Sequence, residues 1–303
     1  MSDQHEHIDL TRLLDLEPIE VNLFRGISPK SKWPRVFGGQ VIGQAMVAAC
    51  RTVEEGRLPH SLHAYFILAG DPTVPIIYEV GRLRDGRSFS TRRVQAIQHG
   101  SAIFSMIVSF AREEKDSFVH QEVMPDVPPP EAFSPEKMAG HPLLKNAPDF
   151  VKSFFESDRP FRRRPVELRP VEFERYVGAG EPGDRINFWI RVNAELPDDP
   201  RIHQCALAYA SDMALLDSIA ARHGKALFGE NIMAASLDHA LWFHRPFRAD
   251  DWMLYSQDSP SAKAGRGLAR GLIFTRDGIH VASVAQEGLI RQRTQPPTSR
   301  RNA

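Results

Sequence analysis

One acidic residue, Asp212, stands where a helix is predicted to begin, in the stretch "SDMALLDSIA" (211–220). A carboxylate at a helix start usually accepts hydrogen bonds from the first free N–H groups, so a capping role accounts for Asp212 on its own. A carboxylate can also accept a proton from water as that water attacks a carbonyl carbon. The residue alone does not decide between a helix cap and a general base.

Two further polar residues lie in or beside apolar runs of the second half of the chain. Ser236 lies in "AASLDHALWF" (234–243), where a serine hydroxyl most often bonds the backbone. Gln286 follows "HVASVA" (280–285), and a buried amide there must find partners across the sheet. An amide is not a base, but it can orient a water as donor or acceptor. Both residues can serve chemistry only if the fold brings them to Asp212.

The histidines raise the question of a metal site. His239 and His244 flank "ALWF", and Asp238 and His280 are further candidate ligands expected nearby in the sequence or in the fold. Five-residue spacing along a strand, however, points the two rings to opposite faces. The chain has neither an HExxH motif nor paired cysteines at zinc-binding spacing. We therefore expect no metal and no dissociable cofactor, and a packing role for these side chains.

The tripeptide Gly38-Gly39-Gln40 also occurs in peptide-release factors. Here it opens an apolar helix, where two glycines allow another backbone to approach closely. A release factor needs a strongly basic face for RNA, whereas this chain has 38 Lys and Arg against 38 Asp and Glu. The charge balance argues against a nucleic-acid partner.

The composition is that of an ordinary globular protein, with 303 residues, 42% hydrophobic and 25% charged. Cys50 and Cys205 lie in apolar stretches, which favours buried thiols in a reducing compartment over a disulfide framework. The first residues, "MSDQHEHIDL", lack the order of a signal peptide, and no apolar run approaches the ~18 residues needed to cross a bilayer. The sequence predicts a cytoplasmic protein without a membrane span.

Two similar halves flank a Pro-rich, charged segment that contains Pro128–Pro130. "SLHAYFILAGDPTVPIIYEV" in the first half corresponds to "SLDHALWFHRPFRADDWMLY" in the second, and "SAIFSMIVSF" to "IHVASVAQEGLI". Each set reads as antiparallel strands.

One apolar helix is predicted before each set. The first carries Val41, Ala45 and Ala49 at four-residue spacing, and the second runs from Asp212 through Leu216 and Ile219 to His223-Gly224. The pattern indicates an internal duplication, with a sheet curling around each helix.

Four stretches, "FGGQVIGQAMVAA", "YASDMALL", "SLDHALWFHRPF" and "VASVAQEGLIR", resemble the acyl-CoA thioesterase II family in the same order. The resemblance implies an α+β double hot-dog fold, in which two antiparallel sheets each wrap around a long helix and join edge to edge. It implies hydrolysis of acyl-CoA to a free fatty acid and coenzyme A. It also implies a catalytic set around one water, here Asp212, Ser236 and Gln286, with Ser236 standing where many relatives have Thr.

In this scheme Asp212 holds the water while neighbouring helix N–H groups face the developing oxyanion. The corresponding first-half stretches have no Asp and no aligned Gln, so we expect the chemistry in the second half and a pocket wall from the first. Coenzyme A carries three phosphate groups, and basic side chains can bind them. The candidates are Arg92, Arg93, Lys263, Arg266 and Arg270, among which the sequence does not choose.

Two other functions are compatible with a hot-dog fold. An enoyl-CoA hydratase typically pairs an Asp with a His about five residues on, but the nearest His after Asp212 is His223. A non-catalytic acyl-CoA-binding regulatory module would explain a pocket, but not Asp, hydroxyl and Gln together. Acyl-CoA hydrolysis is therefore the leading prediction.

The predicted domains are an N-terminal hot-dog at 1–112, a Pro-rich linker at 113–165 and a C-terminal hot-dog with the catalytic residues at 166–292. Residues 293–303 are predicted to form a flexible tail. The expected partners are the acyl-CoA substrate and, from the resemblance, further copies of the chain in a homo-oligomer.

Overall fold

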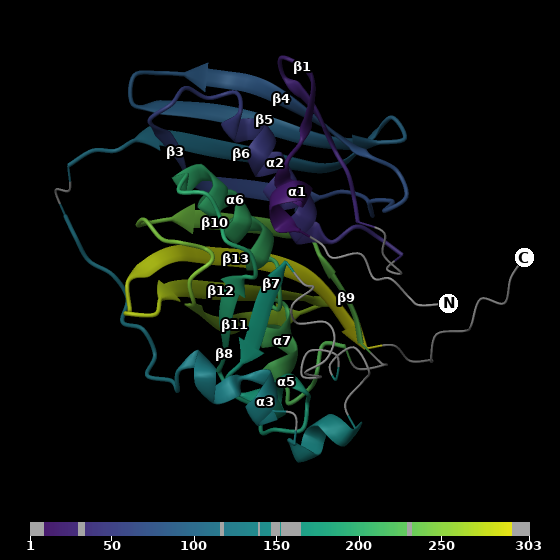
Figure 1. The fold of residues 1–303 in the computed structure, drawn as a ribbon. Helices are drawn as coiled ribbons and strands as arrows, with labels where there is room; N and C mark the ends of the chain where they lie inside the picture. The colour runs from purple at the N-terminus through teal and green to yellow at the C-terminus, as the bar shows by residue number, and fades with distance from the viewer. Residues whose placement is uncertain are drawn as a thin grey trace, which may run out of the picture.

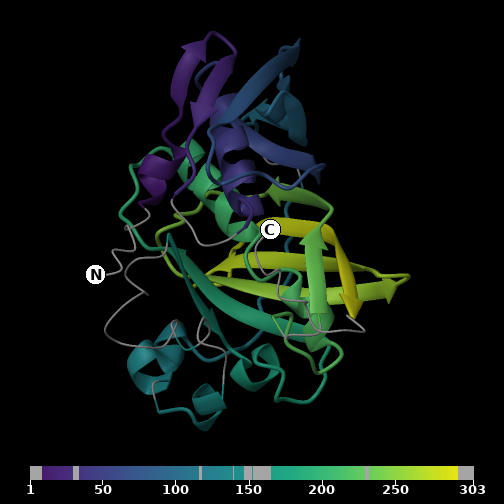
Figure 2. The same cartoon turned by 90° about the vertical axis from the view of Figure 1, so that its right-hand side faces the viewer.

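The computed structural model describes residues 9–29, 34–115, 118–138, 140–146, 152, 165–228 and 232–292. The predicted tail 293–303 lies outside them. The described strands form one sheet of 13 strands, in which 12 follow the order β1-β2-β4-β5-β6-β3-β10-β13-β12-β11-β8-β7 and β9 pairs with β13. Every neighbouring pair is antiparallel. Two views at right angles show the sheet bending around the helices (Figures 1 and 2).

The first half supplies one end of the sheet, drawn purple to blue in Figure 1. Its elements are α1 (Leu10–Leu14), β1 (Glu17–Glu20), β2 (Leu23–Gly26), α2 (Gly38–Cys50), β3 (Arg57–Phe66), β4 (Ile76–Asp85), β5 (Phe89–Gln98) and β6 (Ser101–Arg112). The predicted helix with Val41, Ala45 and Ala49 is α2. Its cover by α1, by α6 (Pro200–Ser211) and by the strands explains why it carries no charged residue.

The second half supplies the other end of the sheet. Its elements are β7 (Val166–Pro170), α5 (Phe173–Tyr176), β8 (Arg185–Val192), α6, α7 (Asp217–Ala221), β9 (Ile232–Ser236), β10 (Asp238–Phe243), β11 (Met253–Lys263), β12 (Arg266–Thr275) and β13 (His280–Gln292). The halves join where β3 pairs with β10, with Leu62 opposite Leu241. The predicted edge-to-edge joining of the two sheets is confirmed.

The position predicted for the second helix is wrong. The long helix α6 ends at Ser211, and only the five residues of α7 are helical in the predicted range. Between them the chain turns through Ala214, whose φ of 60° breaks the helix. The sequence carried the correct signal, since Asp199 caps the helix through Arg201 N–H and Pro200 takes its first position.

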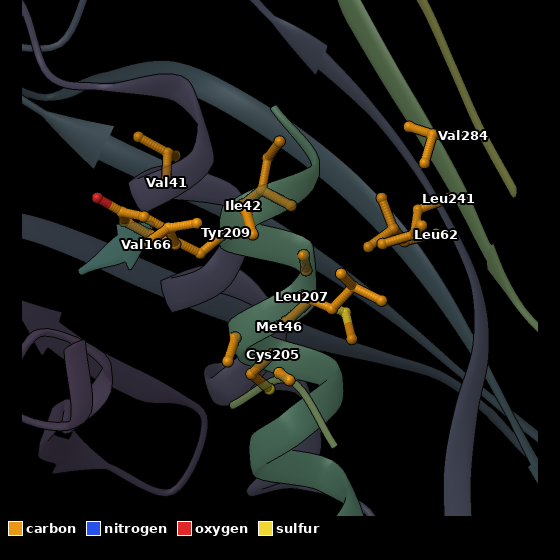
Figure 3. Close-up of a cluster of buried hydrophobic side chains, with 14 of the residues drawn as sticks. Val41, Ile42, Met46, Leu62, Val166, Cys205, Leu207, Tyr209, Leu241 and Val284 are labelled. Atoms are coloured by element: carbon orange, nitrogen blue, oxygen red, sulfur yellow. The ribbon is translucent and has the colours of Figure 1, made fainter. Parts of the chain in front are cut away.

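The two long helices pack directly against each other inside the curved sheet (Figure 3). They run antiparallel, because Gly39 of α2 approaches Tyr209 near the end of α6, while Cys50 and Cys205 place their Sγ atoms 4.0 Å apart at the other end. Both thiols are free and buried. A Cβ on Gly39 would lie 2.3 Å from the carbonyl oxygen of Tyr209, so only glycine permits this approach.

The described residues of the segment between the halves pack along the outer face of the second half of the sheet. They include three short helices, η1 (Pro130–Phe133), α3 (Pro135–Met138) and η2 (Pro142–Asn146). Trp189 of β8 donates from Nε1 to the carbonyl of Pro128 at 2.9 Å, and Met124 packs against the cluster that contains Trp189 and Phe274. No helix in the described residues is long and apolar enough to cross a membrane.

Candidate active site

Asp212 directly follows the C-terminal end of α6, and its carboxylate meets two side chains from the sheet. Gln286 donates from Nε2 to Asp212 Oδ1 at 2.7 Å, and Ser236 donates from Oγ to the same oxygen at 3.5 Å. The structure therefore brings together the three residues that the sequence proposed, although 74 positions separate Asp212 from Gln286. The second contact is long, so Ser236 is the looser member of the set.

The sheet register explains why Ser236 and Gln286 converge. β9 pairs with β13 so that Ser236 lies opposite Gly288, two residues beyond Gln286. Gln286 and Gly288 share the buried face of β13, because alternate residues of a strand point to the same side. A Cβ on Gly288 would lie 2.6 Å from Leu216 Cδ2. Because glycine has no side chain, the segment after α6 can lie close to β13.

The first half contributes more than a wall to this site. The backbone N–H of Gly39, in the first turn of α2, bonds the carboxylate of Asp212. The residue before α2, Phe37, offers no side-chain cap. Asp212 thus caps a helix, but that helix belongs to the other half of the chain. The expectation that Asp212 begins its own helix, with the N–H groups of that helix nearby, is wrong; the nearby N–H groups are those of α2.

The surroundings of Asp212 tune its acidity. Burial raises the pKa of Asp212 to about 6, against the opposing effects of hydrogen bonds from Gln286, Gly39 and Ser236. A carboxyl with this pKa is mostly ionised at neutral pH and still a stronger base than an ordinary aspartate. A carboxyl whose pKa is raised by burial, beside specific hydrogen-bond donors, is typical of a functional site.

A second layer of residues holds the chain next to Asp212. Tyr255 donates from its hydroxyl to the carbonyl of Ser211 at 2.8 Å, and Ser211 Oγ lies 2.9 Å from His239 Nε2. Burial lowers the pKa of His239 to about 3, so the ring is neutral at physiological pH. The sequence carried no sign of the roles of Ser211 and Tyr255. Nothing in their types or spacing pointed to them, because they meet only across the fold.

The other two candidate histidines, His244 and His280, lie away from Asp212 in the second half of the sheet. His244 Nε2 is 2.8 Å from Ser283 Oγ, and the rings of His244 and His280 are 4.8 Å apart. Across the described part of the chain, no three His, Cys, Asp or Glu side chains are grouped as a metal site would require. His239 contacts Ser211 at the end of α6, whereas His244 follows β10 and contacts Ser283 of β13.

The five basic candidates for phosphate binding differ in their burial and in their ion pairs. Arg92 is 1% exposed and bonds Thr52 and Asp85, so its role is structural and the phosphate-binding prediction for it is wrong. Arg270 forms a two-pronged ion pair with Asp258, and Arg266 pairs with Glu287. Arg93 and Lys263 are exposed.

Family models match both halves of the chain. A model described as "Acyl-CoA thioesterase" matches residues 155–289, and one described as "Acyl-CoA thioesterase N-terminal domain" matches residues 29–111. Acyl-CoA thioesterase 2 of Haemophilus influenzae is 41% identical over 283 residues, which cover 93% of this chain and 97% of that protein. Acyl-coenzyme A thioesterase 8 of Mus musculus is 40% identical over 296 residues, which cover 96% and 91%.

Solved structures give the same result for the fold. The acyl-CoA thioesterase II TesB2 from Mycobacterium marinum superposes with a TM-score of 0.73 at 40% identity, covering 94% of this chain and 99% of that one. A hot-dog protein from Alicyclobacillus acidocaldarius superposes with a TM-score of 0.71 at 18% identity, covering 92% and 97%. The second likeness concerns the fold alone, and with the first it confirms the predicted hot-dog architecture.

Proposed function

The chain belongs to the acyl-CoA thioesterase family and hydrolyses acyl-CoA thioesters, and we propose that it does so with one water held by Asp212, Gln286 and Ser236. The hydrogen bond of 2.7 Å between Gln286 and Asp212 carries this proposal. An ionised carboxylate only accepts hydrogen bonds, so the amide nitrogen of Gln286 must face it. The amide oxygen then points elsewhere, and it has no hydrogen-bond partner among the described residues. That oxygen is suited to accept a hydrogen from the attacking water.

In the proposed reaction, the water oxygen attacks the thioester carbonyl carbon while Asp212 takes one proton from the water. Negative charge develops on the former carbonyl oxygen. The N-terminal end of α2, which carries a partial positive charge, lies beside Asp212 and stabilises that oxyanion. The C–S bond then breaks, and the thiolate of coenzyme A takes the proton from Asp212. The products are a fatty acid and free coenzyme A.

Ser236 has an orienting role in this proposal. At 3.5 Å from Asp212 Oδ1, its hydroxyl is close enough to turn towards either the carboxylate or the water. A threonine would keep the hydroxyl and restrict its first side-chain torsion.

The alternative chemistry is attack by Asp212 itself, which would form a mixed anhydride that water then opens. Turnover in ¹⁸O-labelled water tests the form of this route in which water opens the anhydride at the Asp212 carbonyl. Direct attack by water places ¹⁸O only in the fatty acid, and the peptide containing Asp212 keeps its mass. Incorporation of ¹⁸O into that peptide during many turnovers would contradict the general-base role.

We propose the domain division 1–112, 113–165 and 166–292, supported by the end of β6 at Arg112 and the start of β7 at Val166. Limited proteolysis should cut first within 113–165 and leave the halves associated, because β3 and β10 share a ladder. A first cut inside either half would contradict the division.

Two further proposals concern the setting of the protein. A cytoplasmic location is supported by the free, buried thiols of Cys50 and Cys205, which suit a reducing compartment; cell fractionation tests it. A homo-oligomer is supported by exposed apolar side chains on the sheet, among them Tyr65 and Ile107. Light scattering at micromolar concentration should give a multiple of 34.1 kDa.

A further inference from the structure

The side chain of Gln257 on β11 is buried and forms no hydrogen bond with the part of the chain that the structure describes. It is 0% exposed, and neither its amide nitrogen nor its amide oxygen has a partner among the described residues. Gln286 and Gln204 each leave only the oxygen unpartnered. A buried amide without partners is costly, because water has been removed from both of its polar atoms. Gln257 therefore suits a polar partner that enters from outside the chain.

The position of Gln257 is fixed by its neighbours on β11. Gln257 shares the inner face of the strand with Tyr255, whose hydroxyl bonds the carbonyl of Ser211. One residue further on, the carbonyl of Asp258 accepts a hydrogen bond from Ser218 Oγ at 3.3 Å. Gln257 thus lies between two contacts of β11 with 211–218, the segment that carries Asp212.

The sheet register relates Gln257 to the proposed catalytic set. Gln257 lies opposite Gly271 of β12, and Gly271 lies opposite Val284 of β13, two residues from Gln286. Strand spacing and rise place the Cα atoms of Gln257 and Gln286 roughly 12 Å apart, with both side chains on the inner face. This separation suits a substrate whose thioester reacts beside Gln286 and whose acyl chain extends to Gln257.

With the thioester at Asp212, an acyl group that extends inward runs towards Gln257. Asp212 is partly exposed, whereas Gln257 is fully buried beneath the segment that follows it. Coenzyme A is large and charged and stays near the surface, so the part of the substrate that goes inward is the acyl chain.

We propose that Gln257 binds an oxygen carried by the acyl chain, a hydroxyl or oxo group several carbons from the thioester, and so favours oxygenated acyl-CoAs. An amide can donate to an oxo group and can both donate to and accept from a hydroxyl. A plain hydrocarbon chain leaves Gln257 unpaired in the complex, which slows its turnover relative to the oxygenated chain. The inference rests on the proposed function, since it takes Asp212 as the place where the thioester lies.

The test compares kcat/KM for acyl-CoAs of one chain length, either unsubstituted or with a single hydroxyl or oxo group at successive carbons. For at least one position, the wild-type protein should favour the oxygenated chain by about tenfold or more. Gln257→Met keeps the length of the side chain and should remove this preference. The variant should hydrolyse unsubstituted acyl-CoA at least as fast as the wild-type protein does. Gln257→Leu serves the same purpose if the first variant folds poorly.

Gln204→Met is the matched control. Gln204 is also a buried glutamine with an unpartnered oxygen, but its amide nitrogen bonds the carbonyl of Pro59 in the first half. This variant should keep the preference for the oxygenated chain. The proposal is overturned if the wild-type protein treats all positions alike, or if the preference survives in the Gln257 variants, which would leave Gln257 bonded to a buried water only. If the proposed mechanism at Asp212 is wrong, an Asp212 variant will instead keep full activity on both the unsubstituted and the oxygenated acyl-CoAs.

Discussion

The carboxylate of Asp212, in the second half of the chain, accepts a hydrogen bond from the backbone N–H of Gly39, in the first turn of α2 in the first half. This contact joins the end of one long helix to the start of the other. It also places the proposed base at the positive end of a helix dipole, where both the carboxylate and a developing oxyanion are stabilised. The site is therefore built by the packing of the two halves.

Replacement of Asp212 by Asn should separate its chemistry from its structural role. Asn keeps the shape and can still accept from Gly39, but it cannot take a proton. We expect kcat for acyl-CoA hydrolysis to fall by about 10²–10⁴-fold. Release of coenzyme A, followed with a thiol reagent, measures the change. A wild-type rate in a folded Asp212→Asn protein would leave Asp212 as a cap alone.

The same variant should be at least as stable as the wild type at neutral pH. The pKa of Asp212 is 3.8 when unperturbed and about 6 in the fold, so the folded state is penalised as pH rises from about 4 to 6. Above pH 6 the penalty reaches up to about 3 kcal/mol, and Asn removes it. Thermal unfolding of both proteins at pH 4 and pH 7 should show the difference only at pH 7. A lower melting temperature for the variant at pH 7 would contradict this.

The pH dependence of kcat/KM should report the same carboxyl. A base must be deprotonated, so activity should rise about tenfold per pH unit below pH 6 and level off above it. Gln286→Ala removes a hydrogen bond that lowers the pKa of Asp212. The variant should be slower, and the midpoint of its acidic limb should move to higher pH. An unchanged midpoint would mean that the carboxyl seen in the profile is another one.

Two substitutions at Ser236 test the hydroxyl. Ser236→Thr keeps it and should be tolerated, whereas Ser236→Ala should lower kcat with little effect on KM, because the affected step is attack by water. Equal rates for the Ala and Thr variants would show that the hydroxyl of Ser236 takes no part in the reaction.

Gly39→Ala tests the approach of the helices. Its Cβ would lie 2.3 Å from the carbonyl oxygen of Tyr209 and 2.4 Å from the ring of Phe37, so α2 and α6 must move apart. We expect a loss of about 1–3 kcal/mol in unfolding free energy and a lower kcat, because the N–H that bonds Asp212 moves. Gly100→Ala is a control at a glycine with open surroundings but a φ of 74°, and it should lower stability without a specific loss of kcat. A Gly39→Ala protein with normal stability and rate would show that the approach is not required.

The sequence by itself displayed the duplication and the first long helix, because local periodicity and repeated strand patterns can be read directly from a string of residues. Its resemblance to the thioesterase II family implied the joined sheets and the proposed set of Asp212, Ser236 and Gln286, whose side chains meet in the structure. The sequence misplaced the second helix, because an apolar stripe after Asp212 outweighed the cap at Asp199 and Pro200. It also left Arg92 among the phosphate ligands, since an arginine on a strand looks the same whether the fold buries it or exposes it.

Only the tertiary structure decided which helix Asp212 caps, which residues hold Ser211 in place and that Gln257 has no hydrogen-bond partner among the described residues. Each of these depends on contacts between elements far apart in the chain. Asp212 meets Gly39 because antiparallel packing of α2 against α6 brings the start of one helix to the end of the other. Burial beneath that packing then raises the pKa of the carboxyl, which no property of the residue or its neighbours in sequence could set.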